Sequence, residues 1–248
     1  VSENDKEIFS ERFNNKLHGE HLVPDSPAEE KLYKLVDMIE KQYPRKEYPE
    51  VWESLYAIQQ GQTNSLQLIN DKSLSRMELL SVSFEKGGAS VLADGYLVAG
   101  KLNAEQEKAL FGYGVYLQLL DDIQDLKEDF NTETKTLFTS LTNDKRNTFV
   151  NQTIHFGRQT MSEMHCFKKR ETSSFLKLMN QSIETMIIEA VGLNDTFYSE
   201  EWIKKTEKNS PLRFHFIRNK HTESKSQRFT LFKKFINRYQ HETEKQNF

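Results

Sequence analysis

Apolar residues recur along this chain at intervals of three and four residues, the spacing that places them on one face of an α-helix. Serine or proline stands at the start of several of these stretches, where such residues commonly cap or begin a helix. The pattern therefore predicts an all-α protein. Its expected helices cover residues 1–17, 27–43, 49–68, 74–100, 103–130, 142–169, 173–193 and 226–244, with a short helix from Ser199.

The composition favours the same fold class, because the 248 residues include only five prolines and ten glycines. A chain of this length can bury a substantial core. No internal repeat and no break in composition separates two halves of the chain. We therefore expect a single helical domain over residues 1–248.

Charge and hydropathy narrow the setting of the protein. The formal net charge of −3 provides no general attraction for nucleic acid, so no nucleic-acid partner is expected. No apolar run approaches the roughly 18 residues that span a bilayer, and the longest, residues 89–100, contains Asp94. The sequence leaves open whether Asp94 faces a cavity or is paired. The acidic start lacks the apolar core of a signal peptide, and the single cysteine, Cys166, excludes an internal disulfide. These features favour a soluble cytoplasmic protein.

Two adjacent glycines, Gly87 and Gly88, lie in the middle of the stretch 74–100. Each weakens a helix by about 1 kcal/mol relative to alanine. In one interpretation the helix breaks here at a cavity wall and presents Lys86 to an anion. In the other, the glycines allow two helices to pack closely.

A cluster of acids follows the apolar residues 115–120. Asp121 and Asp125 lie about 40° apart around a helix axis, Asp129 repeats the step, and Asp122 lies between this face and the next. Carboxylates on one side of a helix repel one another, so this pattern carries a cost. It is explained either by a solvated acidic face or by a Mg²⁺ ion, which takes oxygen ligands and relieves the repulsion.

The acid cluster resembles the second aspartate-rich motif of the trans-isoprenyl diphosphate synthases. The positions that match this motif are Gly114, Gln118, Asp121, Asp122, Asp125 and the lysine that follows it, Lys135. Leu117 replaces the usual phenylalanine, and Thr134 replaces a glycine. Upstream, residues 85–93 resemble the Lys-Thr segment of the same family, with Gly87 in place of the threonine after Lys86. The similarity covers residues 75–140 and identifies a divergent member of the class I isoprenoid synthase superfamily.

This resemblance implies an antiparallel helical bundle around a central apolar cavity, with a helix broken near the glycine pair. It implies a Mg²⁺-dependent enzyme, similar to polyprenyl diphosphate synthases, that ionises an allylic prenyl diphosphate substrate. Asp121, Asp122 and Asp125 would hold the metal ion, while Lys86 and Lys135 would contact diphosphate oxygens. Gln118 would bind substrate near the reacting carbon, and a homodimer is the expected assembly.

Several alternatives stay open. Chain-elongating members carry a first acid motif that would fall before Val1, so we expect helices with that motif to precede this chain. In a terpene cyclase of the same fold, residues 121–125 would be the first metal motif, and residues 194–199 only approximate the second. A non-catalytic isoprenoid-binding homologue or partner subunit is a further alternative, although the repelling acids argue against a purely structural role.

Overall fold

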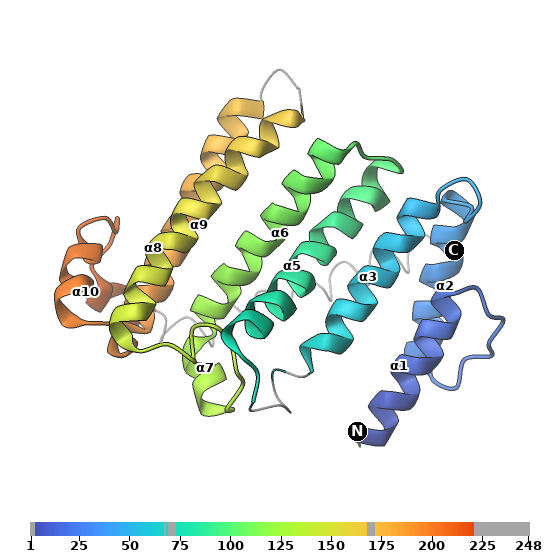
Figure 1. Cartoon of the computed structure of the whole chain (residues 1–248), viewed down its shortest axis with the longest axis horizontal. Coiled ribbons are helices and arrows are strands. Elements are labelled where there is room, and N and C mark those ends of the chain that lie inside the picture. The colour runs from blue at the N-terminus through green and yellow to red at the C-terminus, as the bar shows by residue number, and fades with distance from the viewer. Residues whose placement is uncertain (1–2, 67, 69–72, 168–171, 221–248) are drawn as a thin grey trace, which may run out of the picture. The chain divides into compact units, whose positions relative to one another are not determined.

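The computed structural model describes residues 3–66, 68, 73–167 and 172–220, and every regular element in these ranges is helical (Figure 1). The elements are α1 (Glu3–Leu17), α2 (Pro27–Gln42), α3 (Pro49–Ser65), α5 (Arg76–Ala99), α6 (Ala104–Gln124), α7 (Leu126–Asn131), α8 (Asn143–Glu163), η1 (Met164–Cys166), α9 (Thr172–Leu193), η2 (Asp195–Phe197) and α10 (Glu200–Glu207). The all-α prediction is confirmed for this part of the chain. Nor is any helix within it long and apolar enough to cross a membrane. The helix predicted over residues 226–244 lies outside the described residues.

The chain divides into two compact units, residues 1–183 and 184–248. In the first unit, α3, α5, α6 and α8 lie side by side (Figure 1). Neighbouring helices are antiparallel. As residue numbers increase along one helix, the residues that they contact on the next helix have decreasing numbers. The defining pairs are Val51 with Tyr96 and Gly61 with Lys86 (α3 and α5), Gly87 with Gly114 and Gly95 with Leu110 (α5 and α6), and Gly112 with Thr160 and Gly157 with Tyr116 (α6 and α8). The single domain and the central cavity stay predictions.

Helix α5 runs without interruption through its glycine pair, so the predicted break in this helix was wrong. A capping box between Ser75 and Glu78 begins the helix. A Cβ atom added at Gly87 would lie 2.6 Å from the carbonyl oxygen of Gly114, which leaves no room for a side chain. Close packing of α5 on α6 therefore explains the glycines, and this tertiary contact outweighs their low helix propensity.

The helix that carries the acids ends earlier than the sequence predicted. Helix α6 stops at Gln124, the backbone bends at Asp125 (φ −89°, ψ 3°), and the short α7 continues the chain. The last turn of α6 contains Asp121 and Asp122 and no basic residue. Carboxylates near a helix C-terminus face the negative end of the helix dipole, in addition to repelling one another. Both effects favour the end of α6 at this point.

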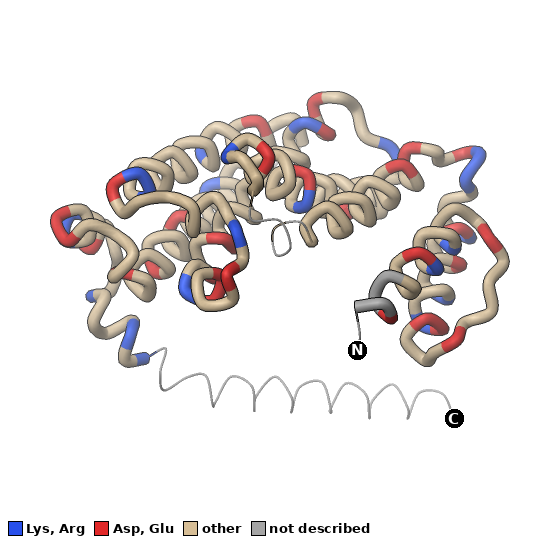
Figure 2. The backbone as a smooth tube through the Cα atoms, turned by 60° about the horizontal axis from the view of Figure 1, so that its bottom comes forward, with Lys and Arg blue, Asp and Glu red and all other residues tan. Residues whose placement is uncertain are grey.

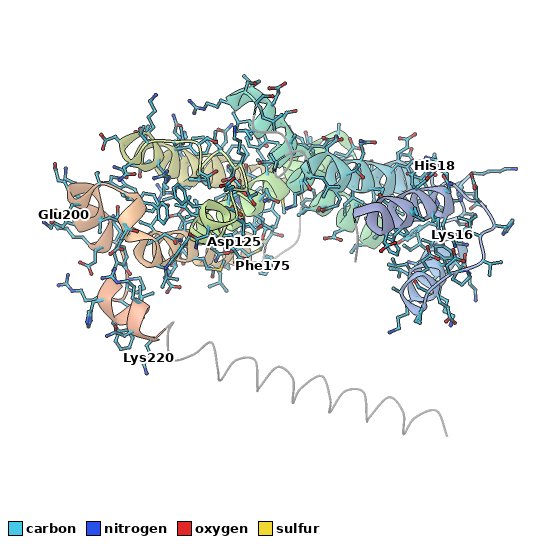
Figure 3. The ribbon with its side chains drawn as sticks, turned by 90° about the horizontal axis from the view of Figure 1, so that it is seen from below. Lys16, His18, Asp125, Phe175, Glu200 and Lys220 are labelled. Atoms are coloured by element: carbon cyan, nitrogen blue, oxygen red, sulfur yellow. The ribbon has the colours of Figure 1, made fainter. Side chains whose placement is uncertain are left out.

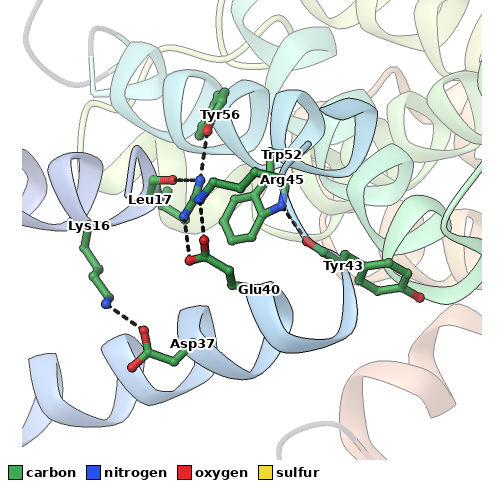
Figure 4. A network of polar contacts seen from close by, with 8 residues as sticks. All are labelled: Lys16, Leu17, Asp37, Glu40, Tyr43, Arg45, Trp52 and Tyr56. Atoms are coloured by element: carbon green, nitrogen blue, oxygen red, sulfur yellow. Dashed lines mark hydrogen bonds and ion pairs between the residues drawn. The ribbon is translucent and has the colours of Figure 1, made fainter. Parts of the chain in front are cut away.

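The N-terminal helices are attached to α3 through a partly buried arginine network (Figure 4). The guanidinium of Arg45 lies 3.5 Å from the ring centroid of Trp52 and donates hydrogen bonds to the Leu17 carbonyl and the Tyr56 hydroxyl. It also pairs with Glu40, with Nε and Oε1 3.0 Å apart. One planar cation therefore joins the end of α1 and the end of α2 to α3.

The second unit is also helical in its described part. Arg218 donates to the Gly192 carbonyl at 3.0 Å and to the Asp195 carboxylate at 2.6 Å. Residues 214–220 form a further helical segment.

Candidate functional site

The acids predicted to hold a metal ion lie at the junction of α6 and α7 in the first unit. Figure 2 shows the acidic positions of the described helices in red. Asp121 and Asp125 are exposed, and Asp125 occupies the bend itself (Figure 3). Asp122 is buried, and Asp129 on α7 is half-buried. The cluster therefore has a solvent-facing part and an interior part, which a single acidic face does not describe.

Asp122 is the unusual member of this cluster, because its exposed fraction is only 5%. The apolar residues Leu119, Ile123 and Leu126 lie within four positions of it in the sequence, and all three are buried. Its Oδ1 atom accepts a hydrogen bond from Gln118 Nε2 at 2.9 Å. Its Oδ2 atom is buried and has no hydrogen-bond partner. A buried carboxylate oxygen in this state costs free energy unless a proton or a cation satisfies it.

The electrostatics follow from this burial. The pKa of Asp122 is raised to about 7, chiefly by burial and also by the nearby Asp129 and Asp121 charges, against the lowering effects of the Gln118 hydrogen bond and Lys86. Burial likewise raises the pKa of Asp129 to about 6, together with repulsion from Asp125 and Asp121. Partial burial, with the charges of Asp121 and Glu128, also raises the pKa of Asp125. Ionisation of these carboxyl groups is therefore less favourable than in water. Carboxyl groups with raised pKa values are typical of functional sites, including cation-binding sites.

Lys86 is a cation that acts on this cluster, since its charge lowers the pKa of Asp122, Asp125 and Asp129. Its backbone lies between two neighbouring helices. A Cβ atom at Gly61 of α3 would be 3.3 Å from Lys86 Cα, and Gly87, the next residue, packs on Gly114 of α6. The glycine contacts thus place a lysine of α5 beside the acids of α6 and α7.

The structure brings together most of the predicted site residues. Gln118, Asp121, Asp122 and Asp125 lie along the last two turns of α6 and at its end, and the charge of Lys86, from the middle of α5, acts on Asp122 and Asp125. Lys135 follows in the loop after α7, where its backbone N–H donates to the Leu68 carbonyl at 2.8 Å. Lys86 is among the main charges acting on the cluster.

The loop that carries Lys135 is held by threonines. The Thr139 hydroxyl accepts from the Thr136 N–H at 2.8 Å and lies within hydrogen-bonding distance of the Thr134 carbonyl. The buried Arg146 then donates to the carbonyls of Phe138 and Leu141 just beyond the loop. These contacts give the Lys135 segment a defined conformation.

Two contributions were missed in the sequence. Asp129 was noted as a repeat of the acid spacing but was not included among the site residues. The charges of Asp125 and Asp121 nevertheless contribute to its raised pKa, so it belongs to the same cluster. Arg146 carried no recognisable signal, because a single arginine in a polar stretch gives no indication of burial. Asp94, whose environment the sequence left open, is exposed on α5.

Within the described ranges, no three His, Cys, Asp or Glu side chains are grouped so that they can hold a metal ion. The chain matches no protein-family model, no curated protein and no solved structure. The arrangement of the α6–α7 junction is therefore the basis for any functional assignment.

Proposed function

We propose that this protein is a Mg²⁺-dependent enzyme of the class I isoprenoid synthase type, which binds an allylic prenyl diphosphate and ionises it. The observation that carries the proposal is the buried Asp122, whose Oδ2 atom lacks a partner beside further carboxylates and the cationic Lys86. A carboxylate cluster beside a lysine is complementary to a divalent cation and a diphosphate bound together.

The side chains suit Mg²⁺ in their chemistry. The ion prefers oxygen ligands and usually binds one or two protein carboxylates, with waters and substrate phosphates completing its shell. A group of three converging carboxylates is therefore not required. Asp122 would supply its unpartnered oxygen, and one exposed carboxylate, that of Asp121 or of Asp125, would supply a solvent-facing oxygen. Bound there, Mg²⁺ supplies Lewis-acid neutralisation of the diphosphate leaving group.

The remaining residues have separate roles in this proposal. Lys86 binds diphosphate oxygens as a point charge, and Lys135 approaches from the loop after α7. When the bond between the allylic carbon and the diphosphate oxygen breaks, the electron pair stays on that oxygen. The resulting allylic cation reacts with a second isoprenoid or cyclises.

The test is the release of inorganic diphosphate from an allylic prenyl diphosphate, with Mg²⁺ and with EDTA. We expect Mg²⁺-dependent release by the wild type and its loss in Asp122→Asn. Asp94→Asn, which changes an exposed aspartate of α5, should behave as the wild type. Absence of release by a folded wild-type protein that still binds the diphosphate would contradict catalysis.

Binding without release of diphosphate would identify the alternative function, a homologue that binds prenyl diphosphates without ionising them. One observation favours it, namely that no group of three or more metal-ligating side chains is found in the described part of the chain. Product analysis would separate chain elongation from cyclisation if release occurs.

A further inference from the structure

The side chain of Gln118 is held at both ends of its length. A Cβ atom added at Gly87 would lie only 2.5 Å from the Cβ atom of Gln118. The backbone of α5 therefore covers the start of the Gln118 side chain. At the other end its amide nitrogen donates to Asp122 Oδ1, one helical turn further along α6. The resemblance to isoprenoid synthases placed this glutamine against the substrate, whereas its amide N–H is here directed to a carboxylate.

This hydrogen bond divides the two oxygens of Asp122 into different roles. Oδ1 is occupied by the glutamine amide, while Oδ2 has no partner and lies in the interior. A side-chain amide in such a position fixes the rotation of the carboxyl group and satisfies one oxygen. Partners of this kind orient the ligands of metal sites, and their loss typically weakens metal binding by about 10- to 100-fold.

We propose that Gln118 is a positioning residue that acts through Asp122. It holds Oδ1 and thereby presents Oδ2 as the one oxygen of this carboxylate that is available to a divalent cation. The inference rests on the proposed function, because it takes the α6–α7 junction as the cation site. It differs from the role implied by the resemblance, since Gln118 acts on a protein ligand and leaves contact with the substrate to other groups.

The first test is calorimetric titration with Mn²⁺ of the full chain, comparing Gln118→Met with Gln62→Met. Methionine keeps the length of glutamine but cannot donate a hydrogen bond, and Gln62 is an exposed glutamine of α3. We expect Gln118→Met to bind Mn²⁺ about 10- to 100-fold more weakly than the wild type, with Gln62→Met unchanged. If circular dichroism shows that Gln118→Met is unfolded, Gln118→Leu, which also lacks a donor and adds no metal ligand, replaces it with the same expectation.

The second test is a spectroscopic signature of the hydrogen bond through which Gln118 acts on Asp122. The side-chain ¹⁵N amide signals of Gln118 are assigned by their loss in Gln118→Met. We expect them to move in Asp122→Asn and to stay in place in Asp94→Asn, without any metal present.

Each outcome decides between the inference and the proposed function. Unchanged Mn²⁺ affinity in the folded Gln118 variant, with loss of affinity in Asp122→Asn, overturns the positioning role and leaves the cation site intact. Amide signals that are insensitive to Asp122→Asn overturn it as well. Absence of Mn²⁺ binding by the wild type overturns both the site and the role assigned to Gln118.

Discussion

Gly87 and Gln118 face each other so closely that a Cβ atom at Gly87 would lie 2.5 Å from the Cβ atom of Gln118. Real Cβ atoms do not approach carbon this closely, so any side chain at position 87 must displace α5 from α6. The same contact places Lys86 beside the carboxylates that follow Gln118. Helix packing and the candidate site therefore depend on one residue pair.

We expect Gly87→Ala to lower the free energy of unfolding by about 1–3 kcal/mol, because overpacking a close helix contact outweighs the gain in helix propensity. Urea unfolding measures this value. Gly112→Ala on α6 is the matched control, since its Cβ atom would meet Thr160 Cγ2 only at 3.3 Å. Equal stability of the two variants would contradict the close contact.

Asp122 should make stability depend on pH. Its pKa is about 7 in the folded protein and near 4 in the unfolded chain. The protonated carboxyl group therefore contributes its full stabilisation of the fold below pH 4, and this contribution is lost as the pH rises through about 7. Without divalent cations, the wild type should lose about 2–3 kcal/mol relative to Asp122→Asn between pH 5 and pH 8.

Urea unfolding of both proteins in EDTA at several pH values measures this difference, in which the other titrating groups largely cancel. The half-buried Asp129, with a pKa of about 6, acts in the same direction in both proteins. A difference that is constant between pH 5 and pH 8 would contradict the raised pKa of Asp122.

Lys86→Gln tests the cation that faces the acids. Hydrogen bonds to charged groups contribute about 1.5–3 kcal/mol, so we expect diphosphate binding in the presence of Mg²⁺ to weaken by about 10- to 150-fold. Lys46→Gln, at an exposed position before α3, should bind as the wild type. Calorimetry gives both affinities, and equal affinities would exclude Lys86 from the diphosphate site.

Arg45→Lys should destabilise the fold without affecting the candidate site. Lysine retains the charge but loses the planar stack on Trp52 and the forked hydrogen bonds to Leu17 and Tyr56. We expect a loss of about 1–3 kcal/mol in urea unfolding. Arg213→Lys, an exposed arginine, should change stability far less. Comparable losses in the two variants would contradict the network.

The helices were largely predictable because their start signals are local. Ser26 with Pro27, and Asn103 with Gln106, begin helices where the sequence predicted them. The continuity of α5 was not predictable from its glycines, because the partner that compensates them, Gly114, becomes adjacent only through tertiary packing. The bend at Asp125 arises from the charge balance of a whole helix end.

The residue types of the candidate site were predictable from the sequence, but their burial and hydrogen-bond partners were not. The spacing of Asp121, Asp122 and Asp125 located the cluster, yet only the fold separates a buried aspartate from two exposed ones. The unpartnered Asp122 Oδ2 depends on where Gln118 points, which spacing alone does not give.

The most direct measurement is calorimetric titration of inorganic diphosphate and of an allylic prenyl diphosphate into the wild type, Asp122→Asn, the double variant Asp121→Ala/Asp125→Ala and the control Asp94→Asn, with and without Mg²⁺. We predict Mg²⁺-dependent binding of both ligands that Asp122→Asn and the double variant lose and Asp94→Asn retains. Absence of binding by the folded wild type, or binding that all the variants retain, would contradict a diphosphate site at the α6–α7 junction.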